Sequence, residues 1–124
     1  HRMNTHPPAI DALIELRDAM RHFTAEREWA VFHTPKNLAM ALAGEAGEVI
    51  EHFQWPTAEQ SAALPPDTRE EVALELADVL LYVIRLADVL AIDLADAARR
   101  KIALNAHRYP VERARGRALK HDKL

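Results

Sequence analysis

The stretch ALAGEAGEVIEHFQW, residues 41–55, decides the fold of this chain of 124 residues. It reads as a helix, yet it contains Gly44 and Gly47, two of the three glycines in the whole chain. Each of them directly precedes a glutamate, Glu45 or Glu48. Glycine inside a helix costs about 0.5–1 kcal/mol relative to alanine. We therefore expect another helix or a ligand to approach the backbone closely at these two positions.

Apolar residues recur at intervals of three and four along the rest of the chain, and runs of β-branched residues are absent, so the sequence predicts an all-α fold. Prolines and capping residues divide the chain into helices at residues 9–28, 35–54, 67–91 and 93–108. At 49% apolar content, a chain of this length can bury one core. We predict a four-helix bundle-like domain over residues 9–109 and a basic, partly ordered tail over residues 110–124.

Local signals set the predicted helix boundaries. Thr34 is a good N-cap residue, and Pro35 after it suits the first position of a helix. Asp67, with Glu70 three residues later, resembles a capping box, and Asp93 repeats this pattern before the last helix. The proline-bracketed loop at residues 56–66 has room for one short helical turn. The apolar residues of the first helix that we expect to face inward are Ile10, Leu13, Ile14, Met20 and Phe23.

Charge and cysteine content restrict the possible partners. The chain has 16 Lys and Arg against 19 Asp and Glu, so its net charge of −3 does not favour nucleic acid or anionic membranes. It has no cysteine, which fits a reducing compartment, and its longest apolar stretch is interrupted by Arg85 and Asp88. We expect a soluble, cytoplasmic protein with neither a membrane nor a nucleic-acid partner.

Acidic side chains fall on helix faces that the apolar pattern predicts to be buried. Glu45 lies in the middle of the apolar stripe of the second helix, and Glu48 lies at the edge of that stripe. Glu75 and Asp78 share an apolar face of the third helix, and we place no histidine one turn away on the face of the second helix. Like charges that face one another in a bundle require a cation to stay ionised. Because all four ligands are oxygen donors, we predict Mg²⁺, with Mn²⁺ as the alternative.

A basic face on the last helix complements this prediction. Mg²⁺ held by carboxylates commonly binds phosphate oxygens as well. Lys101, Asn105 and Arg108 are spaced so that they line one side of the helix, where they can hold phosphate groups. Basic residues at a helix C-terminus are also favoured by the helix dipole, so a plain solvated face stays open as the alternative.

Three segments resemble a known family, the all-α nucleoside triphosphate pyrophosphohydrolases of the MazG type. They are EREWAVFHTPKNLAMALAGEAGEVIEHFQW (residues 26–55), LELADVLLY (residues 74–82) and KIALNAHRYP (residues 101–110). The family pattern E-x-x-E followed by E-x-x-D is met by the four carboxylates above. The resemblance extends over nearly the whole chain and is greatest for the dCTP pyrophosphatase branch.

The resemblance implies Mg²⁺-dependent cleavage between the α- and β-phosphates of a nucleoside triphosphate, which yields the monophosphate and pyrophosphate. The metal would be bound by Glu45, Glu48, Glu75 and Asp78. Glu48 is our candidate for the base that assists the in-line attack of a metal-activated water. The residues implied to hold the phosphates are Lys101, Asn105, Arg108 and Tyr109. The residues implied to surround the base and sugar are Trp29, His33, Asn37, Trp55 and Tyr82.

The resemblance also implies an assembly and a substrate. Dimers that pair into a homotetramer are expected, with Trp55 reaching a neighbour's site. A pocket rich in flat stacking surfaces, together with the dCTP branch, favours dCTP or a 5-modified dCTP. Met20 stands where that branch has a histidine in the first helix, a departure that bears on base selectivity.

Two alternatives stay open. One is a related pyrophosphohydrolase that acts on dUTP, a damaged nucleotide or phosphoribosyl-ATP. The other is a non-enzymatic helical regulatory protein whose basic tail contacts nucleic acid. Acidic residues on core-facing stripes favour an enzyme over the second alternative.

Overall fold

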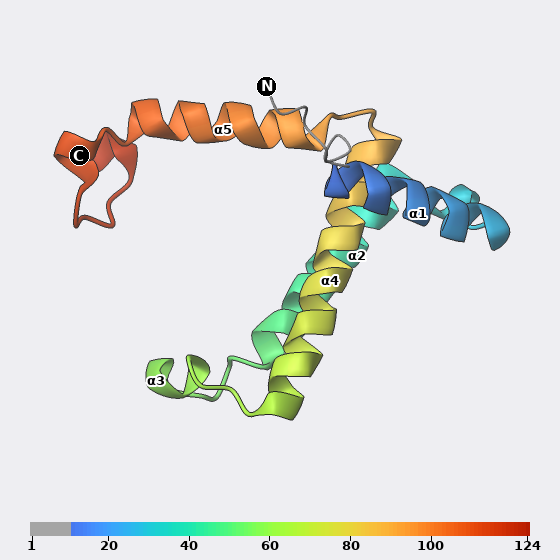
Figure 1. Ribbon diagram of the computed structural model, residues 1–124, viewed down its shortest axis with the longest axis horizontal. Helices are drawn as coiled ribbons and strands as arrows, with labels where there is room; N and C mark the ends of the chain where they lie inside the picture. The colour runs from blue at the N-terminus through green and yellow to red at the C-terminus, as the bar shows by residue number, and fades with distance from the viewer. Residues whose placement is uncertain (1–10) are drawn as a thin grey trace, which may run out of the picture. The chain divides into compact units, whose positions relative to one another are not determined.

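The computed structural model describes residues 11–124, and within this range it contains helices and no strand (Figure 1). The predicted all-α fold is therefore confirmed. A first unit extends to Ala91, and a second begins at Ile92. The first unit holds α1 (Ala12–Glu26), the 3-10 turn η1 (Ala30–Phe32), α2 (Pro35–Glu51), α3 (Ala58–Ser61) and α4 (Pro66–Val89). The second unit holds α5 (Leu94–Arg108), α6 (Val111–Ala114) and the 3-10 turn η2 (His121–Lys123).

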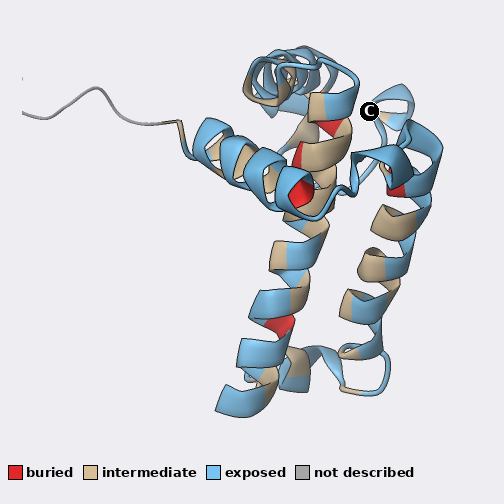
Figure 2. Ribbon diagram, turned by 90° about the vertical axis from the view of Figure 1, so that its right-hand side faces the viewer, coloured by how far each residue is buried: buried red, intermediate tan, exposed pale blue. Residues whose placement is uncertain are grey.

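The first unit is organised around α4. Helix α2 runs beside α4 in the opposite direction, and α1 packs across the later part of α4 (Figure 1). Few side chains of these helices are buried (Figure 2). The buried apolar residues of the described chain are Leu38, Val72, Ile84 and Ala87. This core is small for the amount of apolar surface that the sequence provides.

Local capping explains why most helices begin where they do. The Thr34 hydroxyl accepts from the backbone N–H of Asn37, with Pro35 at the first helical position, as predicted. Asp93 accepts from the backbone N–H of Asp96 at 3.0 Å, which confirms the predicted start of α5. The short turn expected in the loop is α3.

One predicted cap is wrong. Helix α4 begins at Pro66 with Pro65 as its N-cap residue, so Asp67 lies in the first turn instead of capping it. Proline suits the first helical position because it has no N–H to satisfy and its φ angle is already helical. Asp67 still opposes the positive end of the helix dipole from this position.

Predicted helix ends and inward faces differ from the structure in several places. Helix α1 ends two residues early and α2 three residues early, and Glu28 has a left-handed φ of 52°. Leu13 and Met20 are half-buried as expected, but Ile14 and Phe23 leave 45% and 41% of their surface exposed. The buried residue on α1 is Thr24 instead. The predicted helix start at residue 9, and Ile10, lie outside the described residues.

The backbone conformation of Ala91, just after the end of α4, can be tested by mutation. Its φ of 56° lies in the left-handed region, where a Cβ atom is unfavourable and glycine is preferred. We expect Ala91→Gly to raise the free energy of unfolding by about 0.5–1 kcal/mol. Ala73→Gly, inside α4, is the matched control and should lower it by a similar amount. Urea unfolding measures both, and a destabilised Ala91→Gly variant would contradict this conformation.

Candidate active site

The predicted metal-binding carboxylates face one another across α2 and α4. Glu45 and Glu75 are partly buried, whereas Glu48 and Asp78 are exposed. Burial raises the pKa of the Glu45 carboxyl above its usual value, and a hydrogen bond with Glu48 raises it further. The negative charges of Asp78 and Glu75 act in the same direction. The facing helices therefore bring all four side chains into one acidic cluster.

Two oxygen atoms of this acidic cluster fit a bound cation. Oε2 of Glu45 and Oε2 of Glu75 are buried and have no hydrogen-bond partner in the described part of the chain. A buried polar oxygen without a partner is costly unless a cation or a donor satisfies it. Within residues 11–124, however, no three acidic or histidine side chains form a set that is ready to hold an ion. The oxygen donors thus match Mg²⁺, while a closed coordination set is not formed in this structure.

His52 joins the acidic cluster and was missed by sequence analysis. It follows α2 one turn after Glu48, and its Nε2 lies in close contact with Oε2 of Glu75. Oε2 of Glu75 therefore makes an ion-pair contact with His52, although it accepts no hydrogen bond from the described residues. Nδ1 of His52 lies 3.9 Å from Glu71. The expectation that no histidine lies one turn away on this face is wrong, and the four-residue spacing from Glu48 was the available signal.

The glycines of α2 do not serve to pack another helix of the first unit. A Cβ atom at Gly44 or Gly47 would meet no atom within 4 Å among those described. Within the first unit, the expected close approach of another helix is therefore not found. The approach of a ligand stays a prediction.

Three residues implied to surround the base lie where η1 leads into α2. Trp29 packs edge to face on Phe23, with ring centroids 5.7 Å apart. His33 follows η1, and its Nδ1 accepts a hydrogen bond of 3.1 Å from Nε of Arg85 in α4. Asn37, in the first turn of α2, donates from Nδ2 to the Phe32 carbonyl at 3.0 Å.

The other two aromatic residues lie elsewhere. Trp55 follows α2 and leaves 84% of its surface exposed. Since α2 has 17 residues, about 25 Å of helix separates Trp55 from the residues that precede α2. Tyr82 is half-buried in α4. One chain therefore does not bring Trp55 together with Trp29 and His33.

The residues implied to bind phosphate belong to the second unit. Lys101, Asn105 and Arg108 are exposed on α5, whose fifteen residues end at Arg108. Tyr109 caps α5 and packs edge to face on His121, with centroids 5.8 Å apart. The tail after Pro110 is more regular than expected, because it contains α6 and η2.

A partly buried ion-pair network adjoins His33. Nε and Nη2 of Arg21, on α1, donate to the Asp88 carboxylate at 2.7 and 2.5 Å. Nη1 of Arg85 donates to the same carboxylate at 3.4 Å. The side chains of Asp88 and Arg85 are only 10% and 11% exposed. This network ties α1 to the later part of α4.

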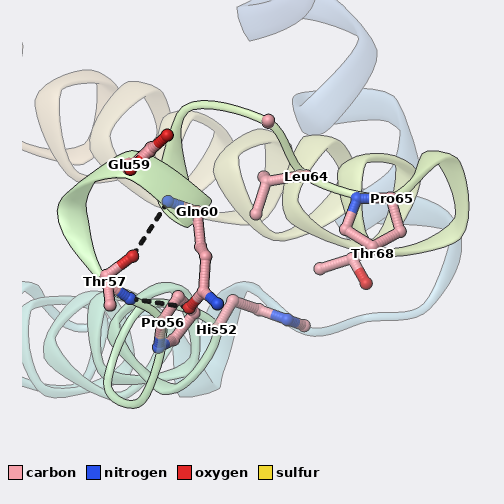
Figure 3. Close-up of a pocket in the computed structure, with 9 residues that line it drawn as sticks. His52, Pro56, Thr57, Glu59, Gln60, Leu64, Pro65 and Thr68 are labelled. Atoms are coloured by element: carbon pink, nitrogen blue, oxygen red, sulfur yellow. Dashed lines mark hydrogen bonds between the residues drawn. The ribbon is translucent and has the colours of Figure 1, made fainter.

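A shallow recess lies where the end of α2, α3 and the start of α4 meet (Figure 3). Its lining includes His52, Pro56 and Leu64. Thr57 and Gln60 bond to each other's backbone N–H groups as a capping box, which orders α3 beside the recess (Figure 3). None of the residues implied to surround the base lines this recess.

Comparison with known proteins identifies the family. Residues 41–124 match the MazG-like family. The dCTP pyrophosphatase 1 of Mus musculus is 42% identical over 114 residues, which cover 90% of this chain and 67% of the mouse protein. The corresponding protein of Homo sapiens is 41% identical with the same coverage. A pyrophosphatase from Archaeoglobus fulgidus, known from its crystal structure, is 35% identical with a TM-score of 0.77, over 88% of this chain and 99% of that one.

The chain belongs to the MazG-like family. The predicted class of enzyme, a nucleotide pyrophosphohydrolase, is confirmed as well. No helix among residues 11–124 is long and apolar enough to cross a membrane.

Asp88 gives a pH-dependent test of the network beside the site. Hydrogen bonding from Arg21 is the main reason why its pKa lies below the usual 3.8, and it outweighs the opposing effect of burial. A carboxyl group with a lowered pKa stabilises the folded protein at pH values above its usual pKa. This stabilisation is lost as the pH falls through the lowered pKa. We expect Asp88→Asn to cost about 1–3 kcal/mol at pH 7, and the difference from the parent to narrow below about pH 4.

Thermal or urea unfolding across this pH range measures the effect. Asp96→Asn is the control, because it breaks an exposed pair with Arg100 and should cost well under 1 kcal/mol. An Asp88→Asn variant as stable as the parent at pH 7 would contradict the network.

Proposed function

We propose that this nucleotide pyrophosphohydrolase acts on dCTP or a 5-modified dCTP in a Mg²⁺-dependent reaction and releases the monophosphate and pyrophosphate. The observation that carries the proposal is the acidic cluster between α2 and α4, with its two buried carboxylate oxygens that accept no hydrogen bond from the described residues. The likeness to the dCTP pyrophosphatases supports the choice of substrate. Such an enzyme would clear nucleotides from the cytoplasmic pool.

The chain's own residues divide the chemistry between them. Glu45, Glu48, Glu75 and Asp78 would hold the metal. When bound, Mg²⁺ would neutralise phosphate charge and make a water molecule more acidic. Glu48 is exposed at the edge of the acidic cluster, where it can take the proton from that water. Glu45 and Glu75 are the more buried pair and would act as fixed ligands.

Substrate recognition would depend on two sets of side chains, one for the phosphates and one for the base. We propose that Lys101, Asn105 and Arg108 hold the phosphates with the Tyr109 hydroxyl, because three of the four side chains are exposed along α5. Stacking on aromatic side chains would bind the pyrimidine, and hydrogen bonds from the segment around η1 would read its edge. The residues in this second role are Trp29, His33, Asn37, Trp55 and Tyr82.

A nucleotide panel tests the proposal most broadly. With Mg²⁺, dCTP and 5-methyl-dCTP should release pyrophosphate faster at subsaturating concentration than dUTP, dATP, dGTP or phosphoribosyl-ATP. Excess EDTA should abolish turnover, and Mg²⁺ should raise the melting temperature because it relieves repulsion within the acidic cluster. Full activity in EDTA would contradict the role of the metal, and faster turnover of a purine nucleotide would contradict the base assignment.

The Glu45→Gln variant distinguishes a role of the acidic cluster in activity from a role in folding. The variant should stay folded without Mg²⁺ and be at least as stable as the parent, since it removes one of four mutually repelling charges. Its activity should fall by at least about a hundredfold if the carboxylate binds the metal. Glu51→Gln, on an exposed position of α2, is the matched control and should retain activity. A Glu45→Gln variant that turns over dCTP like the parent would show that the metal site lies elsewhere.

We also propose that the active form is a homo-oligomer, a dimer of dimers. Large apolar side chains stay exposed on the first unit, including Val31, Met40 and Leu74. Exposed apolar area on this scale marks an interface. Trp55 lies a helix length from His33 in its own chain, so a second copy is the natural source of a tryptophan for each base pocket.

Subunit complementation tests this shared site. Trp55→Ala and Glu45→Gln should each be nearly inactive alone. When they are co-expressed, the acidic cluster of a Trp55→Ala chain can combine with the tryptophan of a Glu45→Gln chain, so about a quarter of the parent activity should return. Light scattering should give about four times the mass of one chain. A monomer with full activity, or no recovery in verified mixed oligomers, would contradict the proposal.

A further inference from the structure

The tautomer of His33 is determined by its hydrogen bond to Arg85. An arginine side chain has only N–H donors and no acceptor. Because Nε of Arg85 lies 3.1 Å from Nδ1 of His33 with hydrogen-bond geometry, Nδ1 must supply the lone pair and carries no proton. A neutral imidazole then carries its proton on Nε2.

The Arg85 guanidinium is itself held in place. Its side chain is 11% exposed, and a buried cation needs a counter-charge. Asp88 supplies this charge one turn later in α4, where Nη1 of Arg85 donates to it at 3.4 Å. Arg21 fixes Asp88 from α1 through two further hydrogen bonds. The position of Nε against His33 therefore depends on a network that joins α1, α4 and the segment before α2.

The electrostatics agree with a neutral ring. Burial lowers the pKa of His33 below its usual value, and the positive charge of Arg85 lowers it further. Nε2 makes no hydrogen bond to the described residues, so its N–H stays available. Asn37, four residues after His33, is also held by a hydrogen bond, which orients its side-chain oxygen as an acceptor. Its Nδ2 donates to the Phe32 carbonyl, which leaves its side-chain oxygen as an acceptor.

We propose that Arg85 is a positioning residue for the reaction, because it fixes His33 as a hydrogen-bond donor, through Nε2, to an acceptor atom on the nucleotide. The inference rests on the proposed function, in which His33 adjoins the base. A cytosine ring offers acceptors at N3 and O2, and an exocyclic amine that suits the oxygen of Asn37. His33 as donor and Asn37 as acceptor thus match the edge of cytosine, whereas uracil and thymine carry a donor at N3 and an acceptor at C4.

The first test measures the protonation of each His33 ring nitrogen directly and needs no enzymatic activity. ¹⁵N NMR of the histidine rings of the full chain at pH 7.5, with His33 assigned through His33→Gln, should show an unprotonated Nδ1 and a protonated Nε2. Arg85→Met should shift the Nδ1 signal towards the protonated form, because Nδ1 loses its donor. Arg85→Lys keeps the charge beside Asp88 and serves if the Met variant does not fold. A parent ring with its proton on Nδ1, or unchanged His33 signals in a folded Arg85→Met variant, would overturn the inference.

The second test measures the steady-state kinetics of the parent and the Arg85→Met variant. In Arg85→Met we expect KM for dCTP to rise about tenfold, as for one lost hydrogen bond, with a smaller change in kcat and a reduced preference for dCTP over dUTP. Arg100→Met is the matched control, because it removes only an exposed pair with Asp96 on α5. A parent that does not hydrolyse dCTP would reject the proposed substrate while the NMR result stands. A parent that hydrolyses dCTP, with Arg85→Met unchanged in KM and preference, would reject the role of Arg85.

Discussion

Repulsion among the carboxylates between α2 and α4 is the constraint on which the rest of the structure depends. Glu45, Glu48, Glu75 and Asp78 come from two helices that pack side by side, so their charges cannot be separated without separating the helices. Burial raises the pKa of Glu45 first of all, and the hydrogen bond with Glu48 and the neighbouring negative charges raise it further. His52 lies against Glu75 at the edge of the same acidic cluster. Because the apolar core is small, this repulsion is a substantial cost to the stability of the first unit.

The small core and the exposed apolar surface have the same origin. Positions on α2 and α4 that carry the acidic cluster are not available for a continuous apolar seam within one chain. The large apolar side chains of η1 and α2 remain on the surface instead, as Phe32 and Met40 show. Stability then comes in part from a polar network, in which Arg21 and Arg85 bind Asp88 across α1 and α4. The same network holds His33, which our proposal places beside the base, through the hydrogen bond from Arg85.

Features that depend on neighbours in sequence could be predicted, and features that depend on distant partners could not. The starts of α2 and α5 follow from Thr34 and Asp93, because a cap involves residues only three apart. The shared faces of the carboxylates follow from helical periodicity. Arg21 and Asp88, however, are 67 residues apart, and Arg85 and His33 are 52 apart, so no local pattern reveals either contact. Periodicity also placed Phe23 in the core, whereas the helices leave 41% of its surface exposed.

The location of the metal is the central claim, and anomalous diffraction tests it most directly. Crystals of the full chain grown with Mn²⁺ and a non-hydrolysable dCTP analogue should give an anomalous peak about 2.0–2.3 Å from oxygens of Glu45, Glu48, Glu75 and Asp78. The analogue's phosphates should contact the same ion. Crystals of Glu45→Gln should show a much weaker peak. A Mn²⁺ peak bound elsewhere by protein and phosphate, with these four carboxylates free of metal, would contradict the account.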